Sequence, residues 1–192
     1  MAPDGGKHDL HTHNVHGKGV AGLQLIPHKT GFATAMEALK EFMRRVPQCV
    51  TVVTSYKDGE PHGMTVSSFT SVSANPPLVM VALERNTQTS RVVSETGFYA
   101  VNLLSHLQME VSENFAYSPH DTRFEKVAYR VEGGRFPVIE GVLATLFCRV
   151  VKQVEAGDHV LYIGEVMGSE TYIDEKPLVY LYRRYWTVKE LA

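Results

Sequence analysis

The chain has 192 residues, of which 44% are apolar and 21% are charged, and its formal net charge at pH 7 is -2. These values are typical of a globular protein with one full hydrophobic core. Because nucleic-acid binding requires clustered Lys and Arg, which a nearly neutral chain lacks, we expect no nucleic-acid partner.

The sequence contains no secretory signal pattern and no run of about 18 apolar residues, so we expect a cytoplasmic protein with no membrane association. Its two cysteines, Cys49 and Cys148, lie within apolar stretches. Free buried thiols are the simplest interpretation, and a disulfide between them stays open.

Residues 1–30 contain few large apolar side chains and four histidines: His8, His11, His13 and His16. Such a segment buries little area, so we expect a flexible His-containing extension ahead of a single domain at 31–192. Alternating histidines can chelate zinc, but a zinc site requires a folded frame, and we therefore predict no metal site.

The first predicted helix carries apolar residues at spacings of three and four, which places them on one face: Phe32, Met36, Leu39, Met43 and Val46. Thr34 and Glu37 have the spacing of a capping box, although Thr30 could also begin the helix. Pro47 ends the pattern.

A hairpin follows, with strand 49–56, an Asp58-Gly59 turn and a second strand that carries the stretch "TVSSFTSVS" at 65–73. Six hydroxyl side chains occupy both faces of this stretch: Thr65, Ser67, Ser68, Thr70, Ser71 and Ser73. Small hydroxyls let a flat heteroaromatic ring approach the backbone. By itself, however, the pattern favours a strand that faces water.

Residues 78–83, after Pro76-Pro77, predict a strand covered on both faces. Residues 86–97 predict a short helix that begins at Asn86 or Thr87 and ends at Gly97. The free N–H groups of a helix start attract phosphate, and Arg85 or Arg91 could neutralise the remaining charge. Simple N-capping explains the same residues without a ligand.

The second half predicts a strand at 98–104, and then a helix that opens with Ser105 and Gln108 as a capping box and carries Leu107, Val111 and Phe115 on one side. Residues 117–137 predict mostly loop. Two long strands at 141–157 and 158–173 and a last aromatic strand at 177–186 complete the chain. Strands outnumber helices and are spaced as hairpins, which indicates a mainly β protein, a small closed β-barrel with peripheral helices.

The signatures of nucleoside-triphosphate hydrolases, Rossmann dehydrogenases, HExxH metalloproteases and GxSxG hydrolases are absent from the sequence. An ordered set of other patterns is present: "GMTVSSFTSVSANPPLVMVAL" at 63–83, "NTQTS" at 86–90, "FYAVNLL" at 98–104, Phe115-Ala116 and "GDHVLYIGEV" at 157–166. Together, over roughly Leu39 to Trp186, they resemble the flavin reductase family. Its members are small NAD(P)H-dependent enzymes with an FMN-binding split β-barrel, often the reductase components of two-component monooxygenases.

The resemblance implies a set of site residues. Met64, Thr65, Val66, Ser67 and Ser68 would line the isoalloxazine ring, and Phe115 and Ala116 would flank the flavin. Ser73, Thr87, Thr89 and Arg91 would meet the ribityl phosphate, and Tyr185 would close the pocket. His159 would position the nicotinamide as the one catalytic candidate, although a lone histidine in a strand is more often structural.

The resemblance also implies the reaction, which is hydride transfer from NADH or NADPH to FMN or FAD. It further implies a homodimer and the passage of reduced flavin, by diffusion, to a flavin-dependent monooxygenase. Three alternatives remain at this stage. One is a non-enzymatic flavin-binding electron carrier, the second an oxidase of a phosphorylated substrate, and the third a cofactor-free barrel that binds a partner through Tyr180, Tyr182, Tyr185 and Trp186.

Overall fold

The computed structural model describes residues 34–191, and the predicted extension at 1–30 lies outside them. Three α-helices and one 3-10 helix are present in this part of the chain: α1 (Ala35–Met43), α2 (Gln88–Thr96), α3 (Met109–Tyr117) and η1 (His120–Lys126). The strands are β1 (Gln48–Cys49), β2 (Thr51–Lys57), β3 (Glu60–Val66), β4 (Thr70–Ala74), β5 (Pro77–Glu84), β6 (Phe98–Leu103), β7 (Tyr129–Glu132), β8 (Phe136–Ile139), β9 (Ala144–Ala156), β10 (His159–Thr171), β11 (Val179–Leu181) and β12 (Arg184–Trp186).

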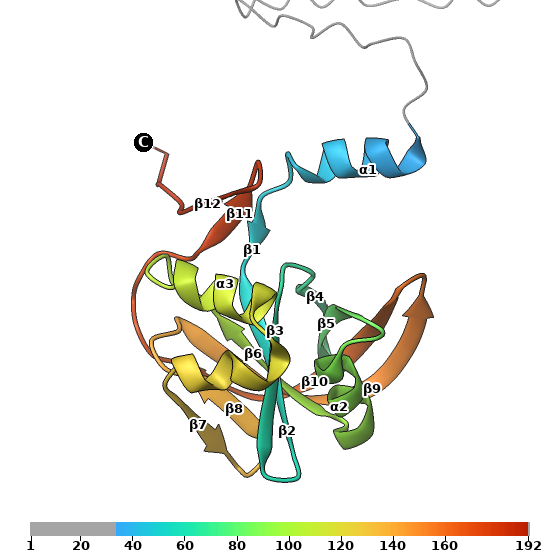
Figure 1. The fold of residues 1–192 in the computed structure, drawn as a ribbon, viewed down its shortest axis with the longest axis vertical. Coiled ribbons are helices and arrows are strands. Elements are labelled where there is room, and N and C mark those ends of the chain that lie inside the picture. Colours follow the sequence, from blue (N-terminus) through green and yellow to red (C-terminus); the bar gives the residue numbers. More distant parts are fainter. Residues whose placement is uncertain (1–33, 192) are drawn as a thin grey trace, which may run out of the picture.

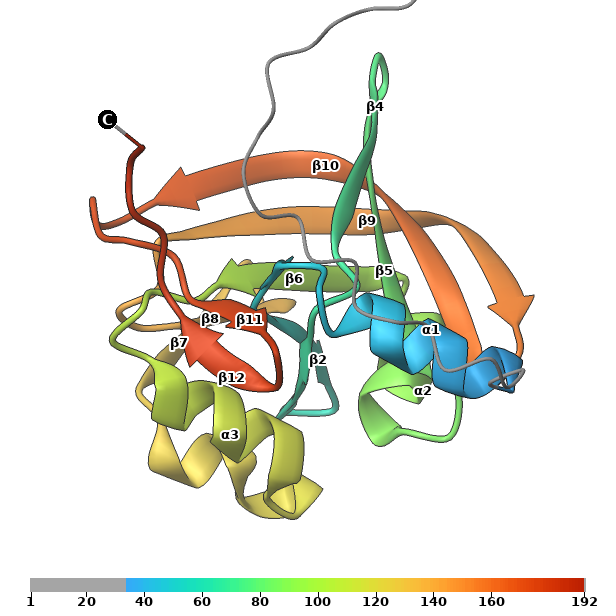
Figure 2. The ribbon, with the colours of Figure 1, turned by 90° about the horizontal axis from the view of Figure 1, so that it is seen from above.

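Seven antiparallel strands form the main sheet, in the order β3-β2-β6-β9-β10-β5-β4 (Figure 1). The two longest strands, β9 and β10, curve together over one side of the molecule (Figure 2). The edge strands β3 and β4 are joined by the bend at Ser67–Phe69 and are not paired with each other. The mainly β barrel with peripheral helices is therefore confirmed. The closed barrel that strand spacing indicated was wrong, because β3 and β4 do not pair, and the barrel is split at this bend as the family resemblance implied.

Ser68 bridges this split with its side chain. Its hydroxyl donates to the Ala82 carbonyl at 2.7 Å and accepts from the Ala82 amide at 3.0 Å, where β5 has no neighbouring strand on that side. One hydroxyl can replace a pair of ladder hydrogen bonds because it both donates and accepts. The hydroxyl of Ser68 is thus part of the frame of the barrel.

The barrel interior is packed around buried Val, Leu and Tyr side chains, and Tyr99 is the largest of those with no exposed surface. Gly164 on β10 makes room for it, because a Cβ at this position would clash with the Tyr99 hydroxyl and stand 2.8 Å from Cζ. The buried Cys148 thiol belongs to the same cluster, and burial raises its pKa to about 12. Both cysteines are free, as the simplest interpretation predicted.

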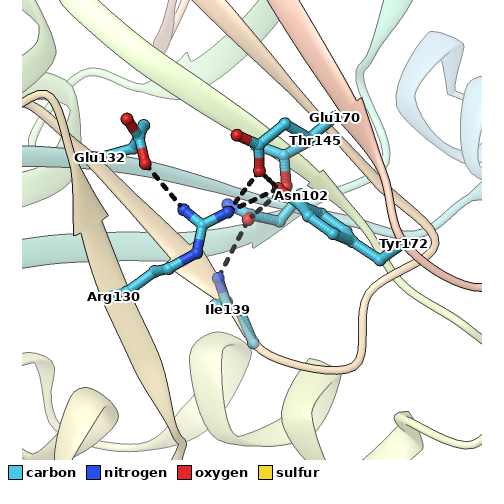
Figure 3. Close-up of polar contacts among 7 residues, drawn as sticks. All are labelled: Asn102, Arg130, Glu132, Ile139, Thr145, Glu170 and Tyr172. Atoms are coloured by element: carbon cyan, nitrogen blue, oxygen red, sulfur yellow. Dashed lines mark hydrogen bonds and ion pairs between the residues drawn. The ribbon is translucent and has the colours of Figure 1, made fainter.

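A fully buried amide connects four strands (Figure 3). The Asn102 side chain donates to the Val52 carbonyl at 3.2 Å and to the Thr54 hydroxyl at 3.1 Å, and it accepts from the Ile139 amide and the Thr145 hydroxyl. A buried amide is stable only when its donors and acceptor are used, as they are here. Asn102 therefore holds β2, β6, β8 and β9 in register.

A polar cluster lies beside this amide at the surface (Figure 3). Arg130 of the β7–β8 hairpin pairs with Glu132 and with Glu170 of β10, and the Tyr172 hydroxyl also contacts Glu170. The Tyr172 hydroxyl, and to a smaller extent the Arg130 guanidinium, lower the pKa of Glu170. The cluster attaches the hairpin to the long strands.

One predicted hairpin and two predicted helices agree closely with the structure. The two-residue turn of the β2–β3 hairpin contains Asp58 and Gly59, both with positive φ, as its sequence predicted. Thr87 caps α2 and Gly97 ends it in the left-handed conformation. Thr34 and Glu37 form the complete capping box of α1.

Four local predictions were wrong. Residues 65–73 form no single strand, because the chain bends at Ser67–Phe69 and continues as β4. Residues 117–137 contain η1 and part of a hairpin, and residues 177–186 fold into the β11–β12 hairpin. The second capping box is half formed, since the Gln108 side chain accepts from the Ser105 amide while the Ser105 hydroxyl has no partner among residues 34–191.

Candidate functional site

A cavity of about 170 Å³ opens at the end of β3, where the barrel is split. Its walls come from β3, α3 and the β11–β12 hairpin, and they combine small hydroxyls with aromatic rings: Val50, Thr65, Val66, Ser67, Ser112, Ala116, Tyr117, Tyr180 and Tyr185. The structure thus brings together five residues that the sequence predicted for the flavin site. They are Thr65, Val66, Ser67, Ala116 and Tyr185.

A chain of hydrogen bonds fixes the walls of this cavity. The Thr65 hydroxyl donates to the Ser112 carbonyl at 2.7 Å, and the Ser112 hydroxyl contacts the Tyr185 hydroxyl at 3.0 Å. Tyr180 packs edge-on against Tyr185 with ring centroids 5.4 Å apart. Burial raises the pKa of Tyr185, which keeps its phenol neutral and able to donate. The result is a preformed slot with polar edges and aromatic walls.

The opposite face of β3 meets the start of α2. Thr87 caps the helix by accepting from the Ser90 amide at 3.2 Å, and its hydroxyl lies 3.6 Å from Met64 Sδ. Thr89, in the first turn, is fully buried, and its hydroxyl has no hydrogen-bond partner among residues 34–191. Met64 and Thr87 are therefore neighbours, but on the side of β3 away from Thr65.

His159 begins β10 and lies opposite Glu84, the last residue of β5. Its Nδ1 is 2.6 Å from the Asp158 carboxylate, and this hydrogen bond lowers the pKa of Asp158. The ring is 44% exposed, so it is a surface side chain rather than a structural histidine of the core. The Thr87 amide also donates to the Glu84 carbonyl. His159 and the start of α2 therefore both lie at the Glu84 end of β5.

Besides Met64, Ser68, Thr87, Thr89 and His159, three more of the predicted residues lie outside the lining of the cavity. Ser73 pairs with Leu78 near the start of β5, whereas Thr87 follows the last residue of that strand. Within one chain, Ser73 and Thr87 are therefore too far apart to bind the same phosphate. Arg91 lines a separate cavity of about 340 Å³ beside the β2–β3 hairpin. Phe115 is fully buried and packs edge-on against Phe124 beneath α3.

The sequence prediction missed four lining residues of the cavity: Val50, Ser112, Tyr117 and Tyr180. On α3, Ser112 precedes the predicted Ala116 by four residues, about one helical turn, so the two share a face. Tyr117 directly follows Ala116 in the chain. Tyr180 faces Tyr185 across the β11–β12 ladder. That pairing becomes visible only once residues 177–186 are known to be a hairpin.

Residues 34–191 contain no cluster of three His, Cys, Asp or Glu side chains able to hold a metal ion. None of the described helices has both the length and the apolar character needed to cross a membrane.

The family model of the flavin reductase like domain matches residues 43–189, which is most of the chain. An NADH-dependent flavin reductase of a Rhodococcus species is 37% identical over 145 residues, covering 74% of this chain and 80% of the relative. The reductase component of 4-hydroxyphenylacetate 3-monooxygenase from Thermus thermophilus is 37% identical over 149 residues, covering 78% and 94%.

A solved structure extends this similarity to the fold. The NADH:FAD oxidoreductase of Streptomyces globisporus, in complex with NAD and FAD fragments, superposes with a TM-score of 0.74 at 29% identity and covers 82% of this chain and 93% of that one. The split barrel and the cavity at its opening thus define a class of flavin-binding barrels. The chain belongs to the flavin reductase family.

Proposed function

We propose that this protein is an NAD(P)H:flavin oxidoreductase whose flavin ring binds at the Ser67–Ser68 bend. The observation that carries the proposal is the slot at the split, where small hydroxyls and the rings of Tyr180 and Tyr185 converge. These groups fit a flat heteroaromatic ring with polar edges. Membership of the flavin reductase family supports the same assignment.

The slot accommodates part of a flavin. Its volume of about 170 Å³ is below the ~300–1,000 Å³ typical of small-molecule sites. We therefore assign the ribityl phosphate to a position outside the slot, near the start of α2. There, the first amides of the helix, at Gln88 and Thr89, offer hydrogen bonds to an anion.

His159 is assigned to the nicotinamide side of the site. Its exposed ring stands at the same end of β5 as Thr87, where a second planar ligand can reach it from solvent. When bound, the flavin itself supplies the hydride-accepting chemistry. The protein has to hold the two rings in contact, exclude water and offer hydrogen bonds, and His159 does this by positioning rather than as a base.

We also propose a homodimer. Three apolar side chains of α1 are more than half exposed, Met36 at 61%, Leu39 at 62% and Phe42 at 68%. A helix with such a face is stabilised by burying it, and a second copy of the chain is the partner that the family suggests. Light scattering should then give twice the chain mass of 21.4 kDa, and a monomer at that mass would refute the dimer.

The acceptor of the reduced flavin is assigned to a separate monooxygenase, which receives it by diffusion. The Thermus thermophilus relative, which is itself a reductase component, supports this proposal. The test is to mix the chain, NADH and flavin on one side of a dialysis membrane with a two-component oxygenase on the other. Oxygenation across the membrane supports diffusion, whereas activity that requires contact contradicts it.

Anaerobic stopped-flow spectroscopy tests the reductase activity itself. Purified protein is mixed with FMN or FAD and then with NADH or NADPH, and bleaching of the visible flavin absorbance is followed. NADH and FAD are the first pair to test, because the Rhodococcus and Streptomyces relatives carry these names. Tight flavin binding without reduction by either nucleotide would instead indicate an electron carrier.

A further inference from the structure

One aromatic wall of the slot carries almost no packing of its own. Tyr117 lines the slot together with Tyr180 and Tyr185, and it is 79% exposed, whereas the other two are half-buried. A large aromatic ring gains stability when it is covered. Because the slot holds only part of a flavin, the Tyr117 ring is available to the part of a planar ligand that the slot leaves outside.

The backbone that carries Tyr117 is fixed on both sides. Tyr117 is the last residue of α3, and earlier in this helix the Ser112 carbonyl accepts from the Thr65 hydroxyl of β3 at 2.7 Å. Directly after Tyr117, the Ser118 carbonyl accepts from Arg123 Nε at 3.0 Å. The exposed ring can therefore rotate about its own side-chain bonds while the end of α3 stays in place.

Arg123 of η1 bridges α3 and β3. While its Nε donates to the Ser118 carbonyl, its Nη1 donates to the Gly63 carbonyl at 2.8 Å, and the Asn114 amide of α3 donates back to the Arg123 carbonyl at 2.7 Å. Burial lowers the pKa of Arg123, and no carboxylate within residues 34–191 offsets this effect. The planar guanidinium thus serves to hold two carbonyl groups in a fixed geometry, which a lysine cannot do.

The Arg123 bridge requires α3 and η1 to lie close to β3. A Cβ on Gly63 would stand 3.0 Å from Phe115 Cε1 and 3.2 Å from Phe124 Cζ, and these two rings pack edge-on with centroids 4.9 Å apart. Glycine at this position therefore permits the close approach. Thr65 lies two positions further along β3 and lines the slot. The bridge thus sets the distance between the β3 wall of the slot and the wall that carries Tyr117.

We propose that Tyr117 controls how long a flavin stays in the slot, by stacking on the part of the flavin ring that lies outside, and that Arg123 is the residue that positions Tyr117. Stacking by an aromatic side chain costs little entropy when its backbone is already fixed. The inference rests on the proposed function and deepens it. It names the residue that decides whether flavin is a firmly held cofactor or an exchangeable substrate.

Flavin release tests the role of Tyr117. In the full chain, Tyr117→Leu should raise both the dissociation constant and the dissociation rate of FMN by roughly tenfold, the effect of losing one stacking contact. Stopped-flow dilution measures the rate through the fluorescence of the released FMN. Tyr117→Phe keeps the ring and should release FMN like the parent. Tyr182→Leu, at an exposed tyrosine outside the slot, is the matched control. An unchanged rate in Tyr117→Leu would overturn the proposal.

A double-mutant cycle tests the role of Arg123. Arg123→Met removes both donors and should speed FMN release by roughly tenfold in the parent, but much less in the Tyr117→Leu background, where no ring is left to position. Equal effects in the two backgrounds would refute the positioning role, because a residue that only stabilises the fold acts in both. Arg123→Lys keeps the charge, carries the same cycle if Arg123→Met does not fold, and should recover only part of the loss. Full recovery would show that the charge matters and the bridge does not.

Failure of this inference is distinguishable from failure of the proposed function. A chain that binds neither FMN nor FAD would contradict the flavin site itself, and the role of Tyr117 with it. A chain that binds and reduces FMN, and whose Tyr117→Leu and Arg123→Met variants release it at the parent rate, would refute the role of these two residues while leaving the reductase function intact.

Discussion

The barrel differs from the rim, which is formed by α1 and the β11–β12 hairpin, in how well its residues suit their backbone conformation and their burial. In the barrel, the turn at Asp58-Gly59 suits its conformation, and Asn102 uses its buried donors and acceptor. At the rim, Tyr182 and Arg183 adopt positive φ angles that are unfavourable for large side chains, and α1 exposes its apolar face. The difference teaches that the barrel is organised for stability and the rim for contacts with other molecules.

The largest expected effect on the barrel comes from Asn102→Leu. This change keeps the volume but removes the hydrogen bonds to the Val52 carbonyl, the Ile139 amide and the Thr145 hydroxyl. The free energy of unfolding should fall by about 3–4 kcal/mol, because several buried groups lose their partners at once. Urea unfolding measures this, with Thr145→Val as the control that removes one bond and costs about 1 kcal/mol.

A second test addresses the packing of β10 against Tyr99. Gly164→Ala places a methyl group against the Tyr99 hydroxyl and should cost about 2–3 kcal/mol, within the range for overpacked cores. Tyr99→Phe removes the hydroxyl and should recover part of that loss in the double variant. A double-mutant cycle by chemical unfolding gives the coupling, and strictly additive effects would show that the clash is relieved elsewhere.

Ser67→Leu probes the boundary between barrel and rim. Leucine at this position fills the slot, so flavin affinity should fall at least tenfold, which is about 1.4 kcal/mol, while the melting temperature changes little. Fluorescence quenching of FMN measures the affinity. Ser73→Leu is the informative comparison, because Ser73 lies at the far end of β5 in the same chain. A loss of flavin in that variant would show that Ser73 acts on the site of a second subunit.

The strained turn offers a smaller effect of opposite sign. Replacing Tyr182-Arg183 by Asn-Gly should raise the free energy of unfolding by about 1 kcal/mol, since the left-handed conformation costs about 1–2 kcal/mol for an ordinary residue. Thermal unfolding measures the gain. Replacing Asp58-Gly59 by Tyr-Arg is the reciprocal change and should destabilise the barrel, and equal stability in both variants would contradict the comparison.

The smallest effect concerns the pH dependence of stability. His62 is buried and stacks on His120, and burial together with the His120 charge lowers the pKa of His62 below 6.5, with Lys57 acting in the same direction and Glu60 and Asp121 opposing. The unfolded chain therefore takes up the proton first. The contribution of His62 is complete above pH 6.5 and is lost as the pH falls through the folded pKa.

Unfolding curves between pH 7.5 and pH 5 measure this contribution. His62→Gln should flatten the acid side of the stability profile relative to the parent. An unchanged slope in His62→Gln would show that other groups cause the acid loss.

Local sequence patterns determined a large part of this molecule. The capping box at Thr34 and Glu37, the Asp58-Gly59 turn and the Thr87–Gly97 helix depend on contacts within a few residues, so their sequences alone predicted them. The ordered patterns from residues 63 to 166 also predicted the family, which the comparisons confirm. Of the candidate site residues, Thr65, Val66, Ser67, Ala116 and Tyr185 were predicted as neighbours and lie around one cavity.

Only the tertiary structure decided which face of each element meets which partner. Ser67 and Ser68 are adjacent hydroxyls, yet Ser67 lines the slot and Ser68 binds Ala82 across the split, because the bend turns them toward different strands. Tyr180 meets Tyr185 because residues 177–186 fold back on themselves. Lys40 and Arg183, which are distant in the sequence, line one hollow between α1 and the β11–β12 hairpin. Side-chain types and local spacing are properties of the sequence, whereas long-range juxtaposition depends on how the sheet closes.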